Sequence, residues 1–127
     1  MKIILTEAIN GNLVAFESDL GHGLALWGSN DTILNKPYNV ELEIDDLFVW
    51  DDNITLENKH NFDIKLDNNL MTFRTKVLSC ADDGVLVMEL GREDIVMIET
   101  SQTREIASSC VSFVTNPTNV TLYPIKL

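Results

Sequence analysis

The sequence predicts one all-β domain over residues 1–127, built as a bent antiparallel sheet, barrel or sandwich with at most one short helix. Short alternating or β-branched segments recur along the chain, and Gly, Asn and Asp turn signals separate them. Helical periodicity is almost absent. With 127 residues and a hydrophobic fraction of 45%, the chain has the size and composition of a globular domain with a packed core.

The chain opens with the signals of a β-hairpin. Segments 3–9 and 13–17 flank the pair Asn10-Gly11, which accepts the positive φ of a tight turn. The segment Gly21–Gly23 predicts a flexible turn before a short strand over 24–27. It lacks the Lys and the following helix of a phosphate-binding loop, so we do not expect phosphate binding there.

The clearest alternation in the chain runs from Tyr38 to Asp45. Apolar residues face one side and acidic residues the other, with Val40, Leu42 and Ile44 opposed to Glu41, Glu43 and Asp45. Asp46 interrupts the alternation and predicts a bulge or bend. The segment 47–50 then returns toward the core before a turn at 51–53.

The centre of the sheet is predicted over Leu70–Glu99. An alternating strand over 70–77 is followed by a hairpin turn at Asp82-Asp83-Gly84 and by two apolar segments, 85–90 and 95–98. We expect the core to contain apolar residues from all three segments: Phe73, Val77, Val85, Val87, Leu90, Ile95, Val96 and Ile98.

The remaining segments carry weaker signals of secondary structure. Segments 54–56 and 62–66 alternate over short lengths, and 111–115 and 120–123 predict the final strands. Segment 103–109 is the one plausible helical turn, although it is too short to be stable without tertiary packing.

Composition limits the classes of partner. The formal net charge is −11, so the surface field repels nucleic acid and anionic membranes and attracts cationic partners. No apolar run approaches the length of a membrane span, and the apolar run near Met1 is too short for a signal peptide. Cys80 and Cys110 have no metal-like spacing and are interpreted as free structural thiols. These features predict a cytoplasmic protein.

No catalytic set stands out, and we expect neither enzymatic activity nor a cofactor. A zinc site would need Cys80, Cys110, His22 and His60 to converge from distant segments. A Cys-His nucleophilic pair is left open by the spacing, but neither cysteine lies in a context that would activate it.

The carboxylates suggest two alternative sites. A calcium site at the acidic turns 51–53 or 82–84 lacks the required ligand spacing, and turn chemistry explains both segments more simply. Glu89 and Glu99 remain candidates for a pair that meets across strands and shares a proton.

The functional hypothesis is a docking surface for a basic protein partner. Its expected residues are the acidic group and one aromatic residue beside it: Glu41, Glu43, Asp45, Asp46, Trp50, Asp51 and Asp52. If Trp50 is exposed, it would anchor the interface, although core packing is the favoured fate for an aromatic residue here. The alternative for the acidic strand face is simple solvation.

A small, acidic β protein that is expected in the cytoplasm and lacks a catalytic set is similar in type to the immunity proteins that bacteria keep against toxins. The similarity covers composition and size. It implies a toxin with nuclease activity as the basic partner. The alternatives are a β-barrel that binds a small molecule and a structural subunit of a larger assembly.

Overall fold

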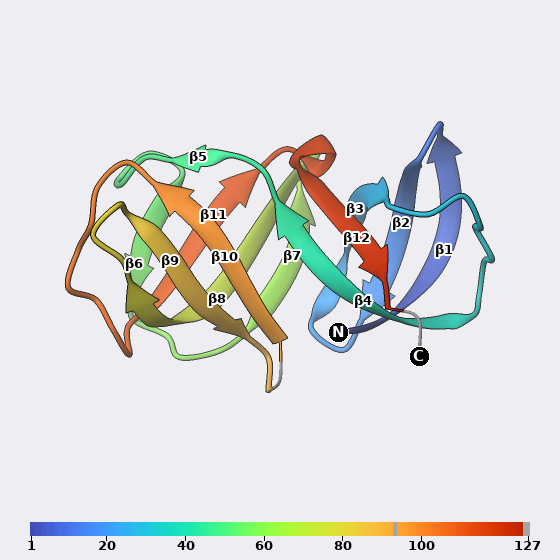
Figure 1. Cartoon of the computed structure of the whole chain (residues 1–127). Helices are drawn as coiled ribbons and strands as arrows, with labels where there is room; N and C mark the ends of the chain where they lie inside the picture. The colour runs from blue at the N-terminus through green and yellow to red at the C-terminus, as the bar shows by residue number, and fades with distance from the viewer. Residues whose placement is uncertain (93, 126–127) are drawn as a thin grey trace.

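The computed structural model describes residues 1–92 and 94–125, and most of this part of the chain is β-structure (Figure 1). All 12 strands belong to one hydrogen-bonded sheet. In chain order they are β1 (Lys2–Asn10), β2 (Leu13–Ser18), β3 (Gly21–Trp27), β4 (Pro37–Ile44), β5 (Leu47–Phe48), β6 (Ile54–Glu57), β7 (Asp63–Asp67), β8 (Leu70–Cys80), β9 (Val85–Leu90), β10 (Asp94–Thr100), β11 (Cys110–Thr115) and β12 (Val120–Pro124). A 3₁₀ turn, η1 (Pro117–Asn119), precedes β12. The all-β prediction is confirmed.

Five strands close into a barrel of mixed direction. β1 pairs with β2 and with β4, and β2 pairs with β3. β12 completes the ring because it pairs with β4 on one edge and, in parallel, with β3 on the other. These strands form the part of Figure 1 that carries the N-terminus. Side chains fill the interior, as is usual for a small barrel; the buried ones include Leu5, Phe16, Trp27, Val40 and Leu122.

The remaining strands are arranged around β8. Its first part pairs with β7 and its last part with β9, while β11 runs along its other edge. β6 lies beyond β11, and β10 lies between β9 and β5. A bridge between Trp50 and Ile54 brings the end of β5 to β6. Phe113 is central to this part of the core, because its ring lies 5.1 Å from that of Phe48 and 5.2 Å from that of Phe73.

Most predicted strands are present. The first hairpin is formed by β1 and β2, although its turn lies one residue later than expected: Asn10 pairs with Leu13, and Gly11 has a φ of 56°. The alternating segment 38–45 corresponds to β4, and the chain bends at Asp46 as predicted. β8, β9 and β10 form the antiparallel centre predicted over residues 70–99.

The segment Gly21–Gly23, predicted as a flexible turn, is instead the beginning of β3. A Cβ atom on Gly21 would lie 1.8 Å from the backbone oxygen of Ile64, and one on Gly23 would lie 2.3 Å from Cε of Met71. These glycines therefore allow β3 to approach β7 and β8 closely, which is the other common use of glycine in a strand.

The predicted core is partly wrong on β9 and β10. Phe73, Val77, Leu90, Val96 and Ile98 are buried, as expected. The other three predicted core residues are not fully buried: Val85 and Val87 are half-buried, and Ile95 is 54% exposed. In the described part of the chain no second layer covers the outer face of these strands, so their apolar runs alternate between buried and exposed positions.

The helical turn predicted over 103–109 is wrong. Ser108 donates its backbone N–H to Val77 O, and Ser109 O accepts from Val77 N–H. The backbone of this segment is thus bonded to β8, and Ser108 has a φ of 70°, which is incompatible with a helix. Burial of Ile106 fixes the segment against the core.

Candidate functional site

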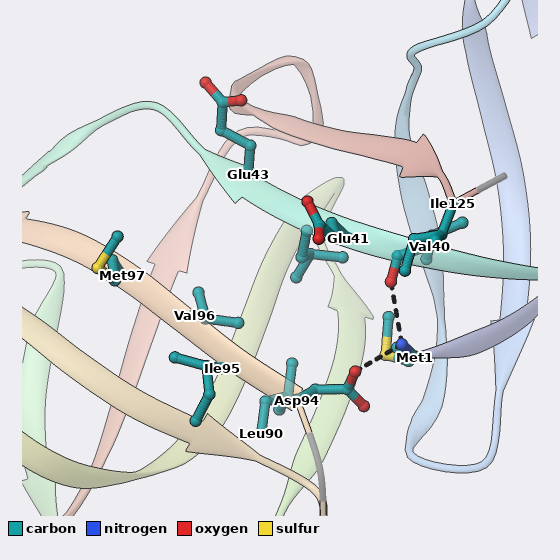
Figure 2. Close-up of a pocket in the computed structure, with 11 residues that line it drawn as sticks. Met1, Val40, Glu41, Glu43, Leu90, Asp94, Ile95, Val96, Met97 and Ile125 are labelled. Atoms are coloured by element: carbon teal, nitrogen blue, oxygen red, sulfur yellow. Dashed lines mark hydrogen bonds and ion pairs between the residues drawn. The ribbon is translucent and has the colours of Figure 1, made fainter. Parts of the chain in front are cut away.

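A cleft separates β4 from β10, and it is the strongest candidate for a functional site. Figure 2 shows its larger part, which has a volume of about 530 Å³ and takes side chains from both strands. A second part of about 330 Å³ continues toward β5. Glu43 and Met97 line both parts, so we treat them together as the β4–β10 cleft.

The pairing of the two strands explains why the cleft exists. β4 is bonded along one edge to β12, and β10 is bonded along one edge to β9. After the bend, β5 pairs in parallel with the end of β10, where Leu47 lies opposite Glu99. At the other end the backbone nitrogen of Met1 donates to Val40 O and to the Asp94 carboxylate (Figure 2). Between these two joins the strands run in the same direction without a ladder (Figure 1).

The cleft combines an apolar floor with an acidic rim. Buried or half-buried apolar side chains form the floor: Val40, Leu42, Ile44, Leu90, Val96 and Ile98. The rim carries the carboxylates Glu41, Glu43, Asp45, Asp46, Asp94 and Glu99. Among the described residues that line it, none is Lys or Arg, and the terminal ammonium of Met1 is already ion-paired with Asp94. Such a surface favours a cationic occupant that also offers apolar area.

Three of the predicted site residues, Glu41, Glu43 and Asp45, lie exposed along this rim. Within residues 1–92 and 94–125, none of their carboxylates forms a hydrogen bond or an ion pair. Their spacing on alternate residues of one strand is about 7 Å. Because all three carboxylates remain available, they can accept hydrogen bonds from Lys or Arg of a partner.

Asp46 also lines the cleft, but its carboxylate is already bonded within the fold. Oδ2 accepts a hydrogen bond from Thr115 Oγ1 at 2.8 Å, and Oδ1 accepts one from the backbone N–H of Leu47 at 2.9 Å. Asn119 donates to the same threonine oxygen at 3.0 Å. These bonds hold the bend between β4 and β5 against the end of β11 and the end of η1.

Trp50 lies in the core, as expected for an aromatic residue in this segment, and is 6% exposed. Its Nε1 donates to Gln102 O at 3.0 Å, and the Arg104 guanidinium lies 4.5 Å from the ring centroid. Arg104 also forms an ion pair of 3.5 Å with Asp51. Asp52 is exposed in the same turn. These three predicted site residues do not line the β4–β10 cleft.

The structure brings together the Cys-His pair that sequence spacing left open. Cys110 Sγ lies 3.3 Å from His60 Nδ1. The thiol is only 3% exposed, however, and a nucleophile must be reachable by its substrate. Cys80 is half-buried beside Thr103, and His22 is exposed on β3. Neither histidine lines the β4–β10 cleft.

The other chemical alternatives are not supported by the geometry. Glu89 lies opposite Ile95 and Glu99 lies opposite Val85, so the two carboxylates do not face each other across the strands. Asp83 Oδ1 accepts from Val85 N–H at 3.1 Å, which is ordinary turn chemistry. Among the described residues, no group of three or more His, Cys, Asp or Glu side chains is arranged to hold a metal ion.

Sequence reasoning missed two residues of the site, Ile95 and Met97. They are 54% and 62% exposed on β10, and both line the larger part of the cleft, whose other side carries Glu41 and Glu43 (Figure 2). Large apolar side chains with this exposure are candidate contact residues. Residues 95–98 form a continuous apolar run between Asp94 and Glu99, so no pattern in the sequence distinguishes the exposed Ile95 and Met97 from the buried Val96 and Ile98.

Comparisons with known proteins assign no relative: no family model, curated protein or solved structure matches the chain. The described residues contain no helix of the length and apolar character required to cross a membrane.

Proposed function

We propose that this protein is a non-enzymatic binding protein that recognises a basic protein partner through the β4–β10 cleft. The observation that carries the proposal is the row of carboxylates at Glu41, Glu43 and Asp45, which have no partner among the described residues and share a cleft with the exposed apolar residues Ile95 and Met97. An apolar centre with a charged rim is the usual composition of a protein interface. The partner is expected to offer Lys or Arg around its own apolar contact residues.

The finer proposal is that the chain is a bacterial immunity protein that acts in the cytoplasm and neutralises a nuclease toxin. A nuclease binds phosphates with Lys and Arg, and regularly spaced carboxylates can occupy the same cationic groups. The net charge of −11 supports this choice, because it accelerates encounter with a cationic protein. The two free cysteines are compatible with a reducing compartment.

The test is a pull-down from the native host with the wild-type chain and with the triple variant Glu41→Lys, Glu43→Lys, Asp45→Lys. The product of the neighbouring gene is identified in parallel. We expect the wild-type chain to retain a basic protein whose nuclease activity falls when an equimolar amount of the chain is added. The triple variant should fold, because these three side chains are exposed, but should not retain that protein.

Circular dichroism of the triple variant verifies its fold before the pull-down is interpreted. If both versions retain the same proteins, or if neither retains a basic protein, the cleft is only solvated and the proposal is wrong. If a basic protein is retained but has no nuclease activity that the chain inhibits, partner binding stands and the immunity role is wrong.

A further inference from the structure

The backbone of β4 presents a free edge to the cleft. In a strand the N–H and C=O groups of successive residues point to opposite edges. Asp45 N–H donates to Asn119 O, and Asn39 O accepts from Ile125 N–H, so the odd-numbered residues of β4 are bonded toward β12. The even-numbered residues therefore point toward β10. Val40 is bonded on that side to Met1, whereas Leu42 and Ile44 have no strand partner there among the described residues.

The facing edge of β10 is free in the same way. Thr100 N–H donates to Gly84 O, so the even-numbered residues of β10 are bonded toward β9. The odd-numbered residues point toward the cleft, and the one nearest the end, Glu99, pairs with β5. Within the described chain, Ile95 and Met97 have no strand partner on this side. Free edges of this kind accept an added strand.

We propose that the basic partner is bound by strand addition: an extended segment with Lys or Arg at every second position bonds to the free edge of β4 at Leu42 and Ile44. This inference rests on the proposed function and specifies how the cleft recognises its partner. Residues directly opposite each other in neighbouring strands point to the same face. Cations on alternate residues of the added strand therefore repeat at the same spacing, about 7 Å, as the carboxylates of Glu41, Glu43 and Asp45.

Charge selects a basic segment over a second copy of the chain. If two β4 edges paired with each other, the acidic residues of one copy would lie next to those of the other, and like charges directly opposite each other are unfavourable. The same carboxylates therefore protect the edge from self-association and select a cationic strand. The residues that alternate with the cations would point toward the apolar floor at Val96 and Ile98, so small or medium apolar residues are expected there.

The probe for this inference is a synthetic peptide in which Lys and Val alternate, with both ends blocked. One control peptide has the same composition with the lysines grouped together. A second control keeps the alternating sequence but carries N-methyl groups on alternate backbone nitrogens, which removes hydrogen-bond donors without changing the charge. Amide hydrogen exchange of the native protein is measured with each peptide.

We expect the alternating peptide to slow the exchange of Leu42 and Ile44 by about tenfold or more, because their amides become bonded. Glu41 and Glu43, whose backbone groups already face β12, should change little. The grouped peptide and the N-methyl peptide should give no such protection. Strand addition is wrong if the alternating peptide does not bind, or if it binds without protecting Leu42 and Ile44. Protection that appears without peptide and rises with protein concentration would instead identify a second copy as the occupant.

The peptide experiment tests strand addition, whereas the pull-down tests the proposed function, so either proposal can fail without the other. Retention of a basic partner by the wild-type chain and not by the triple variant supports the proposed function whatever the peptides do. If that partner then leaves Leu42 and Ile44 unprotected in the complex, the proposed function stands and strand addition is wrong.

Discussion

Asp45 and Asp46 are neighbours in the chain, yet the fold uses their carboxylates in opposite ways. Asp45 points outward with Glu41 and Glu43, and none of the three carboxylates has a partner in the described part of the chain. Asp46 lies on the inward side, where its oxygens accept bonds from Thr115 and from the backbone of Leu47. The same alternation continues through β5, so that Phe48 and Trp50 also point inward.

Within this one acidic segment, the exposed carboxylates are available to bind a partner, whereas the hydrogen-bonded carboxylate stabilises the fold. A buried or half-buried polar group must be hydrogen-bonded, and its loss destabilises the fold. An exposed carboxylate without a partner contributes little to the free energy of unfolding and is free to bind. The odd-numbered acidic residues of β4 should therefore affect recognition, while the even-numbered residues should affect stability.

The largest effect is expected for Trp50→Ala. The substitution removes a buried ring, the Nε1 bond to Gln102 O and the packing under Arg104, and should lower the free energy of unfolding by about 3 kcal/mol. Denaturant unfolding measures this, with Val49→Ala, at an exposed neighbouring position, as the control. A loss below about 1 kcal/mol would contradict the inward assignment of Trp50.

A smaller effect is expected for Asp46→Ala. It leaves the buried Thr115 hydroxyl without its acceptor and frees the backbone N–H of Leu47, so the free energy of unfolding should fall by about 1 to 2 kcal/mol. Asp45→Ala is the matched control, with an expected change within about 0.5 kcal/mol. Equal losses for the two variants would remove the contrast between the neighbouring aspartates.

The smallest effect is expected for Asp51→Asn. Its ion pair with Arg104 spans 3.5 Å, and the aspartate side chain is 79% exposed. The free energy of unfolding should change by less than about 0.5 kcal/mol, as for most surface pairs. Thermal unfolding at low and high salt provides the measurement. A clear loss at low salt that disappears at high salt would show that this pair stabilises the turn more than its exposure indicates.

Strands whose residues alternate clearly between apolar and polar could be predicted from the sequence. The alternation over 38–45 predicted β4 and its acidic face, and Asp46 predicted the bend. The burial of Trp50 follows the same alternation: the even-numbered residues Val40, Ile44, Phe48 and Trp50 are all buried. The bulge expected at Asp46 made that continuity uncertain from sequence alone.

Features that depend on distant contacts could not be predicted. The barrel closes through the parallel pairing of β12 with β3, which joins Thr121 to Leu26, and no local pattern specifies that partner. Gly21 and Gly23 looked like turn residues because their close contacts with Ile64 and Met71 come from other strands. The β4–β10 cleft likewise arises from pairings at its two ends, so the role of Met97 was not visible in the sequence.

The central claim is that the carboxylates of β4, and not the total charge, recognise the basic partner. Its most direct test is the association rate constant of the retained partner with two double variants, Glu41→Lys/Glu43→Lys and Asp51→Lys/Asp52→Lys, which change the net charge equally. The account predicts that the first variant associates at least about tenfold more slowly than the second at low salt, since local complementarity guides docking. Equal rates for the two variants would contradict it, because overall charge alone would then explain binding.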